Sequence, residues 1–286
     1  MSMYELIIEP LSYGFMQRGL LVTVVAATVC ALLSCWLVLM GLSLMGDGIS
    51  HAVLPGVAIS YILGIPYAIG AVLAALTAVA LIGSVSSGGR VRKDAAIGIV
   101  FTTMFALGLV LLSAFPSQVD LHSVLFGNVL GVSWLDLVQV VVLAALVISI
   151  LMIKRKDLIL YAFDPGYTHA IGLNPRALSA ILLVALAVTS VLALQIVGVV
   201  LVVALLVIPG STARLLTDKF NSMFIISIAV SVSGALLGFF CGYLFDVSVG
   251  GTVVLALGTI FGITYLFAPR HGILAHWRAR KMATVA

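Results

Sequence analysis

Two side chains that can bind metals or carry protons stand one helical turn apart in an otherwise apolar stretch. The stretch MGDGISHAVLPG covers residues 45–56, and the two residues are Asp47 and His51. If the apolar run begins near Leu42, His51 lies about nine residues into it. That is roughly 13 Å at ~1.5 Å per residue, close to the middle of a bilayer. A spacing of four predicts that both side chains share one helix face.

An ionised carboxylate at this depth costs about 2.5–3.5 kcal/mol on insertion scales and needs a compensating interaction. Three interpretations are open, namely a structural Asp–His hydrogen bond, a proton relay and a divalent-cation site. Carboxylate oxygen and neutral imidazole nitrogen both suit divalent first-row metals. One helix supplies only two ligands, whereas two copies facing each other across a two-fold axis would supply two carboxylates and two imidazoles. The cation interpretation therefore predicts a metal path at a subunit interface.

Pro55 and Gly56 follow the pair on the same predicted helix. Proline has no N–H and its ring clashes with the preceding turn, so we expect a kink or loosened hydrogen bonding near these two residues.

The whole chain has the composition of a multi-pass membrane protein. Of its 286 residues, 63% are hydrophobic and 8% are charged, whereas soluble domains carry about 25% charged residues. Such a chain cannot cover itself with a wettable surface, which predicts one all-α transmembrane domain over residues 1–286, in contact with lipid. The net charge of +4 does not indicate nucleic-acid binding, because the basic residues stand at the ends of apolar runs.

The apolar runs predict eight or nine spans. Seven lie near 20–40, 42–64, 66–87, 95–115, 134–154, 222–244 and 249–269. Residues 176–214 have room for two short spans, with a return near Gln195–Gly198, or for one long broken helix. The first span is too long for a signal peptide and is expected to be retained.

The basic residues predict the orientation, because they mark the cytoplasmic side of a membrane protein. Apart from Arg18, they fall at Arg90/Arg92/Lys93, Lys154/Arg155/Lys156/Arg176, Arg214/Lys219 and Arg270/Arg278/Arg280/Lys281. If every cluster is cytoplasmic, the N-terminus lies outside, and the linker 154–176 and the basic tail 270–286 lie inside.

Residues 164–172 interrupt the apolar pattern between two of these clusters. Asp164 is a good N-cap with Pro165 at the first helical position, and Gly172 suits the end of a helix of about two turns. The spacing predicts a short capped helix at the cytoplasmic face, either an interfacial linker or a docking element for a cytoplasmic partner.

Five segments resemble the membrane permeases of ABC importers for manganese, zinc and iron. They are SLMGDGISHAVLPGVAISYILGIP (43–66), DAAIGIVFTTMFALGLVLLS (94–113), LFGNVLGVSWLD (125–136), DPGYTHAIGL (164–173) and LQIVGVVLVVALLVIPGSTARLLT (194–217). The likeness covers nearly the whole chain. It implies the dimeric permease fold of these importers in a bacterial plasma membrane, two cytoplasmic ATPase subunits and an extracytoplasmic metal-binding protein. The second permease copy is either the same chain or a related one.

The resemblance also assigns residues. The family motif GD-x-x-SH falls on Gly46, Asp47, Ser50 and His51, which implies that Asp47 and His51 are the metal ligands of the translocation path. The family's coupling helix falls on 164–172, which favours the docking interpretation. The residues expected to couple to the ATPase are Asp164, Pro165, Tyr167, His169, Ala170 and Gly172. One departure is Met40–Gly41, where many members have two arginines.

The sequence predicts a transport subunit that is not itself an enzyme. No lysine follows the glycine pattern of a phosphate-binding loop, so ATP is expected on a partner chain. The resemblance implies manganese as the cargo, then iron or zinc, and we expect no permanently bound cofactor. The alternative is a proton-coupled secondary carrier. Such carriers usually have two related halves with matching broken helices, and no second-half counterpart of GDGISH is found.

Overall fold

The computed structural model describes residues 12–87, 89–115, 129–268 and 272, and the described residues form helices and no strand. The helices are α2 (Gly14–Leu39), α3 (Ser43–Ala52), α4 (Leu54–Leu63), α5 (Tyr67–Ser87), α6 (Lys93–Ala114), the 3-10 turn η2 (Val129–Gly131), α8 (Trp134–Ile153), α9 (Arg155–Phe163), α10 (Pro165–Ala170), α11 (Pro175–Leu216), α12 (Phe220–Leu244) and α13 (Val249–Phe267). The predicted all-α membrane fold is confirmed. The predicted tail 270–286 lies outside the described residues, apart from Gly272.

Eight helical segments in the described part are long and apolar enough to cross a membrane, judged by length and composition alone. Two of them, Pro175–Leu194 and Gly198–Leu216, are the two halves of α11. α3 and α4 are each too short to cross alone, but together they fill most of the predicted span 42–64. The structure therefore agrees with the prediction of eight or nine spans.

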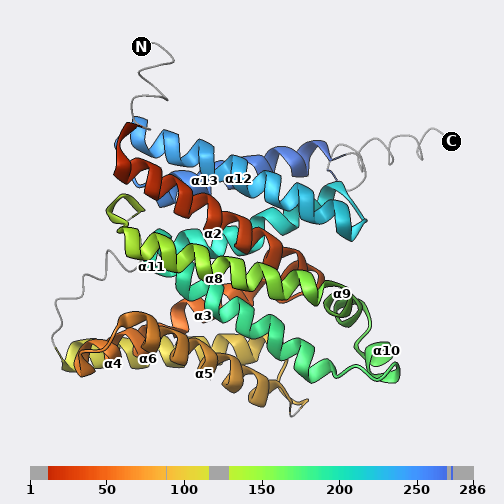
Figure 1. The fold of residues 1–286 in the computed structure, drawn as a ribbon. Coiled ribbons are helices and arrows are strands. Elements are labelled where there is room, and N and C mark those ends of the chain that lie inside the picture. Colours follow the sequence, from red (N-terminus) through yellow and green to blue (C-terminus); the bar gives the residue numbers. More distant parts are fainter. Residues whose placement is uncertain (1–11, 88, 116–128, 269–271, 273–286) are drawn as a thin grey trace.

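α11 breaks at Gly198, whose backbone has φ 78° and ψ 165°. This conformation is essentially restricted to glycine, because a side chain would clash with the backbone. Figure 1 shows the two halves of α11 meeting on the side away from α10, with both far ends on the side of α9 and α10. The chain therefore reverses at Gly198, within the predicted return segment.

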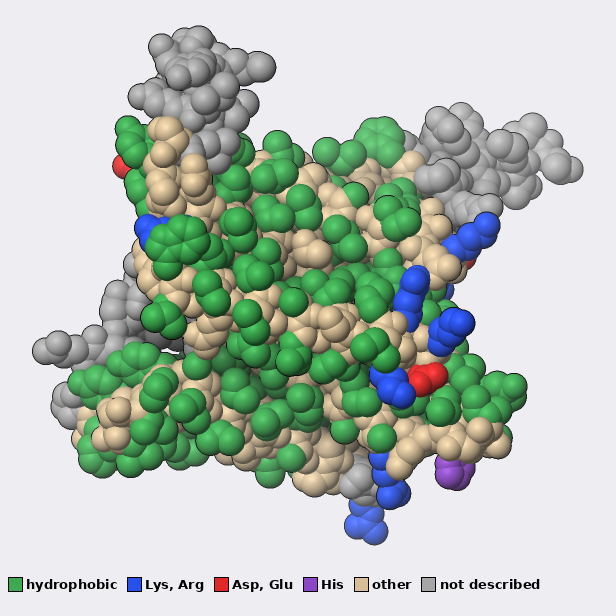
Figure 2. Space-filling model, viewed as in Figure 1, with side chains coloured by type: hydrophobic (Ala, Val, Ile, Leu, Met, Phe, Trp, Pro, Cys, Tyr) green, Lys and Arg blue, Asp and Glu red, His purple; other side chains and the backbone are tan. Residues whose placement is uncertain are grey.

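Basic residues gather at the end of the bundle that carries α9. Lys93 opens α6, Lys154 joins α8 to α9, Arg214 lies in the last turn of α11 and Lys219 caps α12. We call this the basic end of the bundle. Figure 2 shows Lys and Arg side chains mainly at this end, whereas hydrophobic side chains cover most of the remaining face. A row of cations at one end and an apolar belt beside it are typical of a membrane protein with a single fixed orientation.

α2 lies at the centre of the fold and is hydrogen-bonded to two neighbours. The hydroxyls of Ser227 and Ser231 on α12 donate to the carbonyls of Ala31 and Ala27, both at 2.9 Å. The N–H of Gly210 on α11 donates to Ser34 Oγ at 3.0 Å. In an apolar surrounding such bonds contribute about 1 kcal/mol or less each, but they fix the register of α2 against both helices.

α4 and α5 approach each other at two facing glycines. A Cβ added to Gly56 would lie 2.0 Å from the carbonyl oxygen of Gly70, and one added to Gly70 would lie 2.2 Å from the carbonyl oxygen of Gly56. Small residues allow this kind of backbone contact between membrane helices. The contact holds the second half of the broken span against α5.

We predict that Gly56→Ala destabilises the protein by about 1–3 kcal/mol, because the obstructing atom is backbone and the two helices must separate. The measurement is unfolding in detergent micelles. Gly258→Ala is the matched control, since a Cβ at Gly258 meets no atom within 4 Å. Equal stability of the two variants would contradict the close packing of α4 on α5.

Candidate metal site

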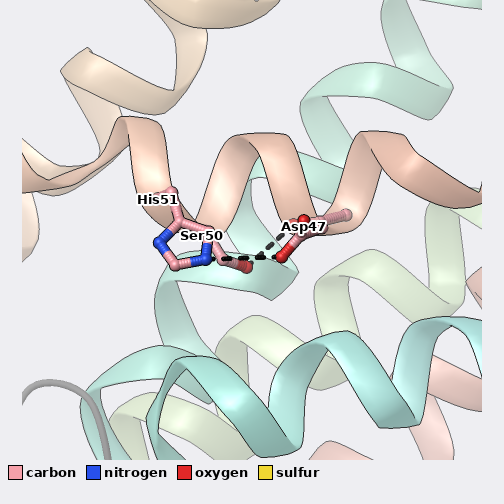
Figure 3. A network of polar contacts seen from close by, with 4 residues as sticks. Asp47, Ser50 and His51 are labelled. Atoms are coloured by element: carbon pink, nitrogen blue, oxygen red, sulfur yellow. Dashed lines mark hydrogen bonds and ion pairs between the residues drawn. The ribbon is translucent and has the colours of Figure 1, made fainter. Parts of the chain in front are cut away.

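Asp47 and His51 lie on one face of α3, as their spacing predicts. His51 Nε2 is 3.4 Å from Asp47 Oδ1, and Figure 3 shows the two side chains directed toward each other along the helix. This distance is longer than a well-formed N–H···O hydrogen bond of 2.7–3.2 Å. The imidazole therefore satisfies the carboxylate only weakly, which leaves both groups with capacity for a further ligand.

The pair is partly uncovered on the surface of the chain. The side chains of Asp47 and His51 are 36% and 27% exposed, and Leu44 one turn earlier is 57% exposed. The opposite face of α3 is buried, with Met45 and Ile49 in the core. The described helices therefore cover this face of α3 only in part.

Two glycines let α3 sit between α6 and α11. A Cβ on Gly46 would lie 2.7 Å from Leu206 on α11, and one on Gly48 would lie 2.8 Å from Ile97 on α6. Because Gly46 and Gly48 flank Asp47 in the chain, these contacts fix the position of α3 along its axis and its rotation about that axis, and hence the position of the carboxylate. Ser50 is buried, and its hydroxyl donates to the carbonyl of Gly46 at 2.8 Å. Ser50 is thus bonded within α3.

Residues of α6 and α11 that lie outside the predicted site surround the imidazole. The rings of Phe105 and Phe101 lie with their centroids 5.3 and 5.8 Å from that of His51, and Phe105 meets it edge to face. Beside His51 is a small, mostly apolar cavity of about 20 Å³ that also touches Leu194 and Val199. A cavity of this size can hold about one water. The i, i+4 spacing of Phe101 and Phe105 in segment 94–113 was the available sequence signal.

The predicted kink lies slightly earlier than Pro55–Gly56. α3 ends at Ala52, Val53 links the helices, and Pro55 stands in the first turn of α4. Because proline has no N–H for the carbonyl four residues before it and its ring clashes with that carbonyl, the helix breaks between His51 and Pro55. Gly56 serves the contact with α5 rather than the bend.

A single chain does not complete a metal site within the described residues. No group of three or more His, Cys, Asp and Glu side chains comes together there. Asp47 and His51 therefore supply two ligands and need others from outside this part of the chain.

The segment predicted as a coupling helix is helical over Pro165–Ala170. Asp164 caps it by accepting the N–H of Tyr167 at 2.9 Å, and Gly172 has a left-handed φ of 87°. The side chains of Tyr167 and Ile171 are exposed, whereas Thr168 is buried. Ala170 ends the helix, and His169 and Gly172 border an open groove of about 580 Å³ at the start of α11.

α9 is a second short helix, and it lies in the segment 154–176 that the sequence predicts only as a cytoplasmic linker. Only Lys154 separates it from α8, so no capping motif marks its start. Its apolar residues show little preference for one face, so hydrophobic periodicity does not predict this helix. We call α9 and α10 together, residues 155–170, the arm.

Comparison with known proteins confirms the resemblance noted in the motifs. The model of the ABC 3 transport family matches residues 12–268. The manganese transport system membrane protein MntB of Synechocystis sp. is 48% identical over 96% of this chain and 90% of its own length. The chelated iron transport system membrane protein YfeC of Yersinia pestis is 40% identical over 96% of this chain and 93% of its own.

A solved structure agrees in fold as well as in sequence. PsaBC from Streptococcus pneumoniae, solved in complex with Fab, superimposes with a TM-score of 0.86 at 36% identity, covering 94% of this chain and 98% of that chain. The family match runs from the start of α2 to the end of α13. This chain therefore belongs to the ABC 3 transport family, as a membrane permease subunit.

Proposed function

We propose that this chain is the membrane subunit of an ATP-driven importer of divalent metal ions in a bacterial plasma membrane. Asp47 and His51 bind the ion on its way across. The observation that carries this proposal is that a carboxylate and an imidazole share one partly uncovered face of α3. Manganese is the preferred cargo, followed by iron and zinc, and the manganese and iron transport named for the two relatives supports this order.

A second permease copy would complete the site. The uncovered face of α3 leaves the carboxylate of Asp47 with neither a close hydrogen bond nor full solvation in the apolar belt, which is costly. Two copies related by a two-fold axis along this face would bring two carboxylates and two imidazoles together. The dimer would thus compensate the charge and provide an ion site with room for water.

The breaks beside the site favour a movable path over a fixed one. Val53 at the break in α3–α4 and Val199 next to the break at Gly198 both border the cavity beside His51. Hinges commonly use a few residues at the ends of elements that absorb changes in φ and ψ. Small rotations at these two breaks would open the ion site to one side of the membrane and then to the other.

The basic end is the cytoplasmic end in this proposal. This orientation follows the positive-inside rule and places the arm where a soluble ATPase can reach it. It also places the end of α13 inside and the start of α2 outside, where an extracytoplasmic metal-binding protein delivers the ion. Tyr167 and Ile171 offer exposed apolar side chains for the ATPase contact.

We predict that Asp47→Asn and His51→Ala each lower metal uptake at least about tenfold. Even outer-shell partners of metal ligands cost about 10–100-fold when removed. The assay is uptake of Mn²⁺ into proteoliposomes that contain the permease with its ATPase, with and without ATP. The control is Asp94→Asn, which removes an exposed carboxylate in the first turn of α6.

Wild-type uptake by both site variants would remove the pair from the ion path. Uptake that follows a proton gradient and ignores ATP would instead favour the proton-coupled carrier, in which the same two residues move protons.

We predict that Tyr167→Ala weakens ATPase binding about tenfold or more, since loss of a large aromatic anchor at an interface commonly costs about 1–2 kcal/mol or more. The measurement is the affinity of the purified permease for its ATPase. Tyr243→Ala, at the opposite end of the bundle and also exposed, is the control. Unchanged binding by the Tyr167 variant would exclude this face of α10 as the docking surface.

A further inference from the structure

Arg155, the first residue of α9, fastens the arm to the helix bundle. Its Nη2 donates a hydrogen bond to Oδ1 of Asn221 at the start of α12. Its guanidinium carbon lies 4.7 Å from the ring centroid of Phe224, one turn further along α12. Its Nε is buried without a hydrogen-bond partner. The guanidinium is thus inserted between the arm and α12, which differs from a solvated surface arginine.

The ring under Arg155 belongs to a packed aromatic cluster. Phe224 meets Trp36 of α2 with centroids 4.9 Å apart and Phe220 with centroids 4.7 Å apart, both edge to face. Trp36 is fully buried and Phe224 is 4% exposed. Edge-to-face aromatic pairs contribute about 0.5–1.5 kcal/mol beyond the area they bury. Arg155 therefore rests on a rigid part of the bundle.

From this cluster, packed contacts continue to the metal-site helix. Ser227 and Ser231 bond α12 to α2, and Ser34 bonds α2 to Gly210 of α11. One turn before Gly210, Leu206 presses against Gly46, the neighbour of Asp47. Each step joins two different helices through a contact that leaves little free space.

We propose that Arg155 is a positioning residue that transmits movement of the arm to the helices that hold Asp47 and His51. The proposal rests on the proposed function, because the arm moves only if a nucleotide-driven partner engages it. If the arm moved away from α12, the guanidinium of Arg155 would lose both Asn221 and Phe224. Its positive charge would then be unpaired at a largely apolar surface, which is costly. The arm and α12 therefore move together.

The geometry requires arginine in particular. A planar guanidinium can stack on a ring and donate sideways to an amide at the same time, whereas the compact ammonium of lysine cannot do both in one position. Leu158, also on α9, is fully buried. Its apolar packing keeps the arm folded against the bundle when Arg155 is replaced.

The test compares Arg155→Gln with Lys156→Gln, which removes the neighbouring exposed cation and so changes the net charge equally. Both are assayed in proteoliposomes with the ATPase partner for Mn²⁺ uptake and ATP hydrolysis. We expect Arg155→Gln to keep hydrolysing ATP while the number of ions imported per ATP falls about 3- to 30-fold, the range expected for coupling residues. Lys156→Gln should match the wild type, and Arg155→Lys should lie between the two.

Wild-type ions per ATP in Arg155→Gln would overturn the proposal, as would an equal loss of hydrolysis and uptake. If that variant does not assemble, Asn221→Ala and Phe224→Leu keep the guanidinium and remove its partners one at a time. Both should lower the ions imported per ATP, and an unchanged ratio in both would also overturn it.

A second measurement does not depend on transport. Spin labels at Tyr167→Cys on α10 and Ile225→Cys on α12, both exposed sites, report the distance between the arm and the bundle in the full chain. The background is Cys241→Ser, because Cys241 is an exposed native cysteine. We expect a broader distance distribution with Arg155→Gln than with Lys156→Gln, and identical distributions would contradict the attachment.

The two proposals can fail separately. If the wild-type complex imports no metal with ATP, the proposed function fails, and the spin-label distances still decide whether Arg155 holds the arm. If the wild type imports metal and the Arg155 variant couples normally, only the role of Arg155 fails.

Discussion

A carboxylate in an apolar medium is tolerated only where something lowers its electrostatic cost, and Asp47 is subject to this constraint if α3 lies in the membrane as we propose. Full burial without a partner would remove the last of its solvation, and full exposure to lipid would be no better. α3 holds Asp47 between these extremes, on a face that the described chain leaves partly open. The glycines on either side of it fix that position, because their contacts with α6 and α11 leave no space for a Cβ.

In the proposed membrane position of α3, the same constraint applies to the two helix interruptions near the pair, the one at Val53 and the one at Gly198. Broken helices inside a membrane expose polar backbone groups, so they are tolerated where protein or a cavity surrounds them. Val53 at the first interruption and Val199 beside the reversal at Gly198 both line the small cavity next to His51, and Phe105 of α6 lines it as well. Regular helices that carry no special chemistry, such as α12 and α13, pack instead through small residues. A Cβ at Gly238 would lie 2.2 Å from the Cα of Val253.

The sequence predicts the features that depend on local chemistry. The shared face of Asp47 and His51 follows from helical periodicity, the cap at Asp164 from its side chain, and the return near Gly198 from the length of the apolar run. Features that depend on packing between distant segments could not be predicted. The placement of Phe105 against His51 and of Arg155 against Phe224 requires knowing which helices are neighbours. α9 could not be predicted either, because it follows α8 with no cap and no clear apolar face.

The conformation of Gly198 decides on which side of the membrane the ends of the later described helices lie. Each transmembrane helix carries the chain to the opposite side of the membrane. One additional reversal therefore inverts the direction of every later transmembrane helix. If α11 ran straight, its last turn with Arg214 and the cap of α12 at Lys219 would lie across the membrane from Lys154. The cations would then be divided between the two sides of the membrane, although basic residues tend to gather on one side. The direction in which the later described helices cross the membrane thus depends on Gly198, a residue without a side chain.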